Sequence, residues 1–395
     1  MRLVERHIIK DNRFEDICLK SGLLYNYVLY LVRQGIFNKE YLKEYDLSTK
    51  LGRENQFDFR NLPCNVSQQV VGQVFKSINS WIKLKKDFEK NPAKYNNCRP
   101  HLPSYKKGKK QNMVVFTTNT CRVKEGYIYF VKNIISPIKT KIGDGKLCQV
   151  RIIPQATCYV VEVIYEKKEQ DLNLNKDNVL SIDLGLNNLC SCVNNVDKQP
   201  FIVNGRIMKS FNQWYNKRKA KLMSFAGDKG TSKRLRQLNN YRNFWIEDHI
   251  HKVSRFVINY CVDNNIGSLV VGLNKGWKQE INLGKKTNQK FVEIPFSRLI
   301  DKISYKCKLV GISFYLSEES YTSKVDHLAF EELGKHDVYL GKRKQRGLFQ
   351  SSVNKLINAD INGAIGIGRK VFGDSYVSRI IDSGLAFNPI KVNIS

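Results

Sequence analysis

Two aspartates in the second half of the chain stand where carboxylates could bind a metal ion. Asp183 ends the largely apolar run Val-Leu-Ser-Ile and precedes Leu-Gly-Leu, whose glycine lets the backbone approach a metal or a phosphate. Asp360 lies at the start of a helical pattern, in Asn-Ala-Asp-Ile-Asn-Gly-Ala. Because Mg²⁺ prefers hard oxygen ligands, carboxylates that converge on one point predict a divalent-cation site, and two such ions support phosphodiester hydrolysis.

Each aspartate also has a simpler interpretation. Asp183 could close a turn, which is the commoner role of an Asp-x-Gly sequence. Asp360 could be an acid in the first turn of a helix, where it interacts with the helix dipole by about 0.3–1 kcal/mol. The strands and helices that carry the two aspartates decide between these interpretations.

Those elements follow one another in a recognisable order. Strands are predicted up to Asp183 and over Cys190–Val193, Phe201–Val203, Gly267–Gly272 and Ile312–Ser317. A basic helical region is predicted over 209–264, a helix over Phe296–Val310 and the final helix over Asn358–Val371. The run Gly267–Gly272 is continuously apolar between helical patterns, as buried parallel strands are. Three strands, a helix, a strand, a helix, a strand and a helix form the order of an RNase H-like domain. In that fold the first strand lies beside the fourth, and the fifth lies on the far side of the fourth.

The first part of the chain has a different pattern. A short alternating strand at Leu3–Ile9 precedes two helical patterns, Phe14–Arg33 and Ser67–Phe88, and a basic, turn-rich connector, Asn91–Gln111. Strand patterns then return at Met113–Phe116, Tyr127–Val131, Gln149–Ile153 and Thr157–Tyr165. The sequence therefore predicts an α+β, multidomain protein in which a helical block interrupts an N-terminal β-domain.

Charge indicates the kind of partner. The chain has 66 Lys and Arg against 36 Asp and Glu, a formal net charge of +30. So much positive charge repels itself unless an anionic partner neutralises it, which leaves nucleic acid or an acidic membrane surface. No apolar run reaches transmembrane length, so nucleic acid is the expected partner. The 10 cysteines are scattered without a Cys-x-x-Cys pair, which is typical of a reduced, cytoplasmic protein.

Several motifs together resemble the TnpB proteins of bacterial insertion sequences. Asp183-Leu-Gly-Leu is similar to the first RuvC motif of that family, and Asn358-Ala-Asp360-Ile-Asn-Gly-Ala is similar to the third. Further similar segments, in the expected order, are Leu62-Pro63, Leu102–Lys106, Gly276–Glu280, Phe291–Phe296, Glu319–Lys324 and Gly341–Leu348. The resemblance covers most of the chain, and its strength lies in the set of motifs.

The resemblance implies a domain plan and an activity. Residues 1–12 and 100–175 would form an OB-like β-barrel wedge domain, interrupted by a helical recognition domain at 13–99, and residues 176–395 would form an RNase H-like (RuvC) nuclease domain. The activity would be RNA-guided DNA endonuclease cleavage beside a short flanking motif, with guide RNA and double-stranded target DNA as partners. Whether the protein would act as a monomer or a dimer on RNA is left open.

One departure concerns the second catalytic carboxylate. The family usually ends the fourth strand with a glutamate, and here that position is Gly272. A residue that ends the fifth strand would lie roughly 10 Å from Asp183, two strand spacings away, so Glu319 could lean over the space that the glycine leaves empty. A branch of the family with a relocated glutamate supports this assignment. Alternatives are Glu318, the more weakly placed Glu280 and Glu293, and a purely solvated role for Glu319.

A second departure concerns zinc. Many relatives hold a zinc ribbon with two Cys-x-x-Cys pairs between the second and third motifs, but residues 308–395 contain no cysteine. His327 and His336 alone make a poor zinc site and are expected to be surface or packing residues. We therefore expect two Mg²⁺ ions held by Asp183, Glu319 and Asp360, no zinc, and a zinc-less insertion at about 325–354.

Residues that could contact nucleic acid are basic, aromatic or hydroxyl-bearing. They are Lys106, Lys107, Lys109, Lys110, Arg218, Trp277, Lys278, Thr322, Ser323, Lys324, Lys342, Arg343, Lys344 and Arg346. Clusters of this kind are often only solvated faces, Trp277 could instead cap a core, and residues 322–324 could merely shape the end of a strand.

Three alternative functions fit the sequence. Gly272 suggests that the chain could be a nuclease-dead, RNA-guided DNA-binding repressor. It could be a CRISPR-associated effector with the same chemistry in a different genetic setting. A third alternative is an accessory of transposition that binds DNA without RNA.

Overall fold

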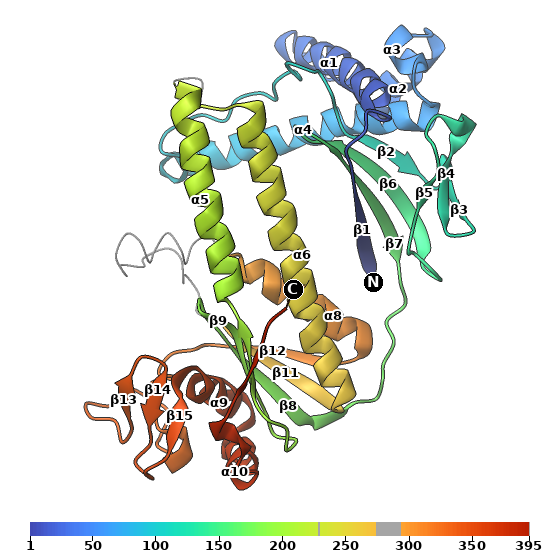
Figure 1. Ribbon diagram of the computed structural model, residues 1–395. Coiled ribbons are helices and arrows are strands. Elements are labelled where there is room, and N and C mark those ends of the chain that lie inside the picture. The colour runs from blue at the N-terminus through green and yellow to red at the C-terminus, as the bar shows by residue number, and fades with distance from the viewer. Residues whose placement is uncertain (228–229, 274–293, 395) are drawn as a thin grey trace. The chain divides into compact units, whose positions relative to one another are not determined.

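The computed structural model describes residues 1–227, 230–273 and 294–394. The chain divides into two compact units, Met1–Lys168 and Glu169–Ser395. Both contain helices and sheets, so the predicted α+β class is confirmed (Figure 1). None of the described helices is long and apolar enough to cross a membrane.

The first unit contains a four-stranded antiparallel sheet in the order β1-β7-β6-β2. Its strands are β1 (Arg2–Ile9), β7 (Tyr159–Glu166), β6 (Lys146–Pro154) and β2 (Val114–Thr117). Beside it lies a small sheet of β3 (Cys121–Lys124), β4 (Tyr127–Phe130) and β5 (Ile138–Lys139). The strand at the very start of the chain thus pairs with one about 150 residues later, and the predicted β-domain interrupted by a helical block is present.

The interrupting block consists of α1 (Glu15–Phe37), α2 (Glu44–Arg53), α3 (Phe57–Arg60), α4 (Cys64–Lys90) and a 3₁₀ turn at Pro92–Tyr95. In α4 the residues Val66, Val70, Val74 and Ile78 recur at helical spacing and are all buried. The sequence predicted α1 and α4 but not α2 or α3. The reason is that α2 buries only Leu47 and Leu51, too few apolar residues to show a period.

The second unit is built on a six-stranded sheet in the order β12-β11-β8-β9-β10-β16. Its strands are β8 (Asn175–Leu184), β9 (Asn188–Asn194), β10 (Phe201–Asn204), β11 (Ile266–Gly272), β12 (Ser313–Ser317) and β16 (Ile390–Val392). β8, β9 and β10 are antiparallel, whereas β11 is parallel to both β8 and β12. The predicted neighbours of the first, fourth and fifth strands are therefore confirmed; β16, which joins the edge beside β10, was not predicted.

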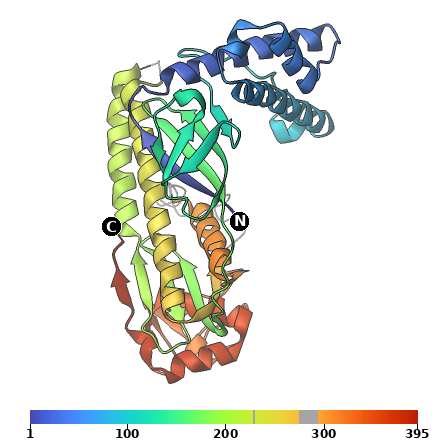
Figure 2. The same cartoon turned by 90° about the vertical axis from the view of Figure 1, so that its right-hand side faces the viewer.

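Helices cover both faces of this sheet. Alternate residues of β11 point to opposite sides: Leu269 and Val271 belong to the core shared with α6 (Lys233–Asp263) and α8 (Phe296–Val310), whereas Val270 packs in the core of α9 (Ala359–Phe372) and α10 (Asp374–Asp382). The helical region predicted over 209–264 is present, but the element order counted it as one helix, whereas α5 (Arg206–Ala226) and α6 are separate helices that lie side by side (Figure 2). The prediction that α9 is the final helix was wrong, since α10 follows it; a 3₁₀ turn at Leu385–Phe387 and β16 come after α10.

Between β12 and α9 lies a small subdomain. It contains a 3₁₀ turn at His327–Ala329 and a three-stranded antiparallel sheet of β13 (Lys342–Gln345), β14 (Leu348–Gln350) and β15 (Leu356–Asn358). β15 runs directly into α9, so this segment and the start of α9 form one continuous support for Asp360.

Candidate functional site

Asp183 lies near the carboxyl end of β8, opposite Ser191 of β9. Its carboxylate is close to helix α9, because a Cβ built on Gly363 would lie 3.1 Å from Asp183 Oδ2. A larger residue at 363 would crowd the carboxylate. The glycine of the Asn-Gly-Ala motif thus allows the helix that carries Asp360 to pass beside the strand that carries Asp183.

Asp360 is oriented by residues on three elements. The side chain of Asn358 caps α9 by accepting hydrogen bonds from the backbone N–H groups of Asp360 and Ile361. Asn188, at the start of β9, donates its side-chain N–H to Asp360 Oδ2 over 2.6 Å. Arg343 of β13 places Nη2 4.0 Å from Asp360 Oδ1. One oxygen of Asp360 is therefore held by an amide, and the other faces a guanidinium.

Glu319 occupies the space above Gly272. The last residue of β11 pairs with Ser317 at the end of β12, and the chain then turns through Glu319. A Cβ built on Gly272 would lie 2.6 Å from Glu319 Oε1 and 2.7 Å from its Cγ. This is the arrangement that the sequence predicted for a glutamate ending the fifth strand, whereas its role as a metal ligand stays a prediction.

The negative charges of Glu319 and Asp360 act on Asp183. The pKa of Asp183 is raised well above its usual value, first by burial and then by the negative charges of Glu319 and Asp360. Burial also raises the pKa of Glu319 to about 7, opposed by the positive charge of Lys370. Clustered carboxylates in a poorly solvated place resist ionisation, and a cation among them would relieve that cost.

This set of ligands fits Mg²⁺ by its chemistry, since all three groups offer hard oxygen atoms. Within the described residues, however, no three His, Cys, Asp or Glu side chains already surround one point closely enough to hold an ion. Glu319 and Asp360 act electrostatically on Asp183, but the three carboxylates do not yet surround one point. A bound cation would have to bring them closer.

The rival glutamates are placed differently or lie outside the described residues. Glu318 is exposed, and its carboxylate accepts a hydrogen bond from Ser320 Oγ. Glu280 and Glu293 lie outside the described residues, as do the predicted contacts Trp277 and Lys278. Of the described glutamates considered, Glu319 is the one beside Gly272 and Asp183.

The segment after Glu319 is partly buried. Thr322 is 3% exposed, and its hydroxyl donates to the backbone carbonyl of Glu319 over 2.8 Å. Ser323 and Lys324 are exposed, and the Lys324 ammonium lies 5.9 Å from the centre of the Tyr339 ring. Thr322 therefore shapes the turn in this structure, which is the simpler of its two predicted roles, while contact with nucleic acid stays a prediction for Ser323 and Lys324.

The remaining basic residues lie on exposed surfaces of each unit. Lys107, Lys110, Arg218, Lys342, Arg343, Lys344 and Arg346 are exposed. Lys109 pairs with Glu15 over 2.9 Å. Lys106 is less accessible, because its ammonium lies 4.5 Å from the centre of the Tyr25 ring and burial lowers its pKa.

The segment at about residues 325–354 is held by a buried polar network. Asp326 is fully buried, and its Oδ2 accepts hydrogen bonds from the hydroxyls of Ser351 and Ser352 and from the Ser352 N–H. Glu331 accepts from the Asp326 N–H, and Arg369 of α9 donates to the Glu331 carbonyl. These bonds tie the segment to itself and to α9, which is the task that metal ligands perform in a zinc ribbon.

The two histidines of this segment bond to backbone carbonyls. His327 is fully buried and its Nε2 donates to the carbonyl of Thr322 over 2.7 Å. His336 makes a similar bond to the carbonyl of Glu332. His327 is therefore a packing residue, whereas His336 lies at the surface, and both fit the expectation of surface or packing residues.

Sequence reasoning missed an aromatic stack between α5 and α6. The Phe211 and Trp245 rings stack with centroids 3.9 Å apart, and Trp245 stacks in turn on His249 at 5.2 Å. Next to Phe211 lie Trp214 and Tyr241, whose exposed fractions are 47% and 53%. The sequence did contain one indication of a nucleic-acid-binding surface here, because α5 (Arg206–Ala226) has many Lys and Arg and no acidic residue.

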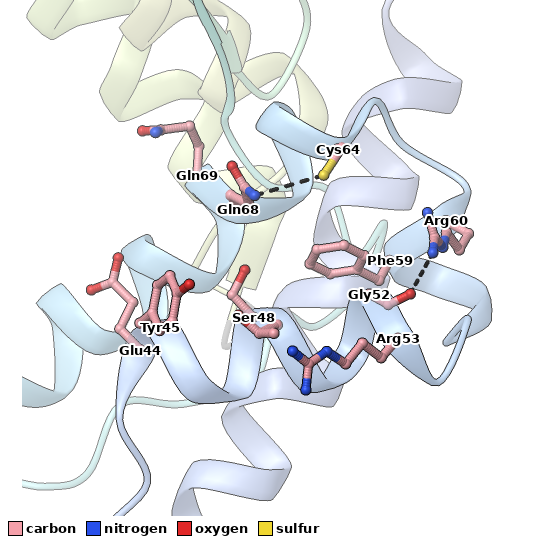
Figure 3. Close-up of a pocket in the computed structure, with 11 residues that line it drawn as sticks. Glu44, Tyr45, Ser48, Gly52, Arg53, Phe59, Arg60, Cys64, Gln68 and Gln69 are labelled. Carbon is pink, nitrogen blue, oxygen red and sulfur yellow. Dashed lines mark hydrogen bonds between the residues drawn. The ribbon is translucent and has the colours of Figure 1, made fainter.

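A separate concavity of about 730 Å³ lies among α2, α3 and α4 of the first unit (Figure 3). Its lining includes Tyr45, Arg53, Phe59 and Arg60, and the side chain of Arg60 donates to the carbonyl of Gly52. Glu44 is the one acidic residue in the lining. A lone carboxylate cannot supply a two-metal site, so this concavity does not replace Asp183, Glu319 and Asp360 as the candidate site.

Comparisons with known proteins indicate a family. A family model described as a probable transposase (OrfB_IS605) matches residues 161–278, and one described as Cas12f1-like, TNB domain, matches residues 296–367. No curated protein matches the sequence.

Solved structures give a similar result. A cryo-EM structure of a Cas12f1–sgRNA–target DNA complex is similar over 90% of this chain and 81% of that chain, with 14% sequence identity and a TM-score of 0.52. A CRISPR–Cas12f ternary complex is 13% identical, covers 90% of this chain and 80% of that chain, and has a TM-score of 0.38. The mini-RNA-guided endonuclease CRISPR–Cas_phi3 is 10% identical, covers 99% of this chain and 93% of that chain, and has a TM-score of 0.44. Both TM-scores are below 0.5, too low to indicate a shared fold. The resemblance to the TnpB family predicted from the motifs is therefore confirmed, and the chain is TnpB-like in sequence and similar in fold to a Cas12f1 protein.

Proposed function

We propose that this protein is an RNA-guided DNA endonuclease that cuts target DNA beside a short flanking motif. The observation that carries the proposal is that Glu319 and Asp360 lie near enough to Asp183 to raise its pKa, with Glu319 placed over Gly272. All three come from the carboxyl ends of β8 and β12 or from the start of α9. Sites in sheets with parallel strands typically lie at this edge.

The second unit would be an RNase H-like (RuvC) nuclease domain. Support comes from the order β12-β11-β8-β9-β10, in which the first strand lies beside the fourth and the fifth beyond it. In the first unit, the β-sheets would form the OB-like wedge and the helical block α1–α4 the recognition domain. The proposed boundaries stay at residues 1–12 and 100–175 for the wedge, 13–99 for recognition and 176–395 for the nuclease.

In the proposed mechanism, Asp183, Glu319 and Asp360 would hold two Mg²⁺ ions. Such ions would supply orientation of the attacking water and stabilisation of the leaving oxygen of a phosphodiester. Asn188 keeps Oδ2 of Asp360 in a fixed direction, as the partners of ligating carboxylates generally do. Arg343, close to Asp360 and exposed, would place a positive charge where the scissile phosphate enters.

Guide RNA and double-stranded target DNA would be the partners. The net charge of +30 requires anionic neutralisation, and the similar Cas12f1 structure is a complex with sgRNA and target DNA. The exposed basic residues of both units would hold the RNA through its backbone and shape. Base pairing between guide and target would then read the sequence, while the protein checks the short flanking motif.

The alternative of a nuclease-dead, RNA-guided repressor rests on Gly272. The seating of Glu319 over that glycine favours the active enzyme, because a replacement carboxylate is present where the usual one is missing. A CRISPR-associated effector would have the same chemistry. The fold similarity to a Cas12f1 protein is compatible with that genetic setting.

The proposal is tested with protein co-expressed with its native flanking locus. The co-purifying RNA is sequenced, and the complex is incubated with Mg²⁺ and a matching plasmid library that carries randomised flanks. Depletion of plasmids with one flanking motif is the expected result. Guide-dependent binding without cutting would establish the repressor, and purification without RNA would favour the RNA-free accessory of transposition.

A further inference from the structure

The turn that carries Glu319 has an unfavourable backbone conformation. Tyr321 has φ of +65°, the left-handed region that bulky residues rarely adopt. Such a conformation costs on the order of 1–3 kcal/mol and persists only where neighbouring contacts impose it. The contacts that hold residues 318–322 therefore determine where the Glu319 carboxylate lies.

Lys370 of α9 supplies two of those contacts. Its ammonium donates to the backbone carbonyl of Glu318 over 3.0 Å and to that of Ser320 over 2.6 Å. One side chain thus holds the residues on both sides of Glu319. The carbonyl of Glu319 itself accepts from Thr322, and the carbonyl of Thr322 accepts from His327.

The contacts of Lys370 belong to one stripe along α9. Residues three or four apart share a helix face, and Asp360, Gly363, Ile367 and Lys370 follow that spacing. Gly363 is beside Asp183, and Ile367 is beside Gly272, where its Cδ1 would lie 2.5 Å from a Cβ at 272. The stripe therefore begins at Asp360, passes Asp183 at Gly363, and ends at Lys370, which holds the turn of Glu319.

We propose that Lys370 is the positioning residue of the relocated glutamate. Its ammonium fixes the turn of residues 318–320 against α9, so that the Glu319 carboxylate stays over Gly272 and toward Asp183. This inference rests on the proposed two-metal function. It gives α9 a second role, besides carrying Asp360, which is to hold the turn of Glu319. A glutamate at the end of β11 would not need this support, because the backbone hydrogen bonds between the strands would already fix its position.

The test measures metal binding in the guide-loaded protein, independently of cleavage. Binding of Mn²⁺, which takes the same oxygen ligands, is followed by electron paramagnetic resonance of the free ion in the wild type, Lys370→Met, Lys370→Arg and Asp183→Asn. Lys252→Met is the matched control, because Lys252 is also a helical lysine and its ammonium pairs with Asp248 over 3.1 Å. Melting temperatures are recorded for every variant.

Lys370→Met is expected to weaken the Asp183-dependent Mn²⁺ site by roughly 10- to 100-fold, the usual effect of removing a partner of a metal ligand. Lys370→Arg, which keeps a cationic donor, should recover most of the affinity, and melting temperatures should stay within the range of Lys252→Met. Unchanged Mn²⁺ affinity in Lys370→Met would overturn the inference. So would a loss that follows a lowered melting temperature without rescue by arginine, which would make Lys370 merely structural.

Failure of the proposed function looks different. In that case the wild type itself would show no Mn²⁺ site that Asp183→Asn removes. That result would overturn the two-metal proposal and this inference with it. A site present in the wild type and intact in Lys370→Met would overturn the inference alone.

Discussion

The side chain of Glu319 fills the space that any side chain at residue 272 would need. A Cβ on Gly272 would lie 2.6 Å from Glu319 Oε1, closer than real Cβ contacts come. The glycine at the end of β11 and the glutamate after β12 are therefore structurally coupled. Because Gly272 has no side chain, the Glu319 carboxylate can occupy the place where an acid at residue 272 would lie.

Gly272→Ala is expected to lower cleavage while the protein still folds. The new methyl group would press on both Cγ and Oε1 of Glu319 and on the Ile367 side chain, and so move the carboxylate away from Asp183. A displacement of about 1 Å can cost on the order of 10²-fold in rate. Single-turnover cleavage and guide binding, measured side by side, separate this effect from a folding defect; wild-type cleavage by Gly272→Ala would contradict it.

The reciprocal change should restore activity. Glu319→Ala removes the carboxylate and should abolish cleavage. Adding Gly272→Asp then places a carboxylate in the space that the Glu319 side chain occupied. The double variant is therefore expected to cleave measurably, whereas Glu319→Ala alone does not. The comparison uses the same guide and target at several Mg²⁺ concentrations. No recovery in a folded double variant would count against the shared position.

Arg343 should affect cleavage more than binding. It is 57% exposed and lies near Asp360, and its charge opposes the raised pKa of Asp183. Arg343→Ala is expected to lower the cleavage rate by roughly 10²-fold, as removal of a preorganised electrostatic group does. Lys344→Ala, a neighbour on the same exposed strand, is the control. Equal effects of the two variants on cleavage and binding would reduce Arg343 to one of several phosphate contacts.

The exposed rings beside the α5–α6 stack should contribute to nucleic-acid binding. Trp214 lies at the end of a series of stacked rings on a basic helix, which is the arrangement of a base-stacking platform. Trp214→Ala is expected to weaken binding of the guide or target strand by about 1–3 kcal/mol, roughly 5- to 150-fold, with Trp214→Phe close to wild type. Phe225→Ala, at a residue 77% exposed on the same helix, should change little. Filter binding at fixed salt distinguishes these outcomes.

His327 should make the folded protein less stable as pH falls below about 6.5. Burial lowers the pKa of His327 to about 4, and its Nδ1 meets no hydrogen-bond donor among the described residues. Between the folded and unfolded pKa values the unfolded chain binds more protons, so stability rises with pH across that window and is lost as pH falls through it. The full difference is on the order of 3 kcal/mol.

His327→Gln removes this titration but keeps an N–H that can donate to the Thr322 carbonyl. The melting temperature of the wild type should therefore drop more than that of the variant between pH 7 and pH 5. Parallel curves for the two proteins would show that His327 does not control this part of the pH dependence. Asp183 and Glu319, with raised pKa values, act in the opposite direction in both proteins.

The sequence predicted the elements whose residues carry a strong local pattern. The apolar runs of β8 and β11 and the helical stripe of α4 are of this kind. It did not predict β16, whose three residues Ile390–Val392 are mostly exposed, or the break between α5 and α6, which falls in a polar stretch. Short or polar elements form because of partners far along the chain, and such partners leave no local period.

The same distinction holds within the candidate site. Asp183, Asp360 and Glu319 could be named because strand and helix ends are visible in the sequence. Asn188 and Lys370 could not, because the partner of Asn188 is 172 residues away and that of Lys370 is 50 residues away. An amide or ammonium group that bonds across such distances is chosen by the fold, and its neighbours in sequence do not reveal it.

The central claim, that Glu319 supplies the second carboxylate, is tested most directly by Mg²⁺-dependent cleavage of a guide-matched duplex by the wild type, Glu319→Gln and Glu318→Gln. The two glutamates are adjacent, and each substitution removes one negative charge with almost no change in size. Loss of cleavage in Glu319→Gln, with guide and target binding intact and Glu318→Gln close to wild type, is the predicted result. Full cleavage by Glu319→Gln would contradict the account and move the second ligand to another acid.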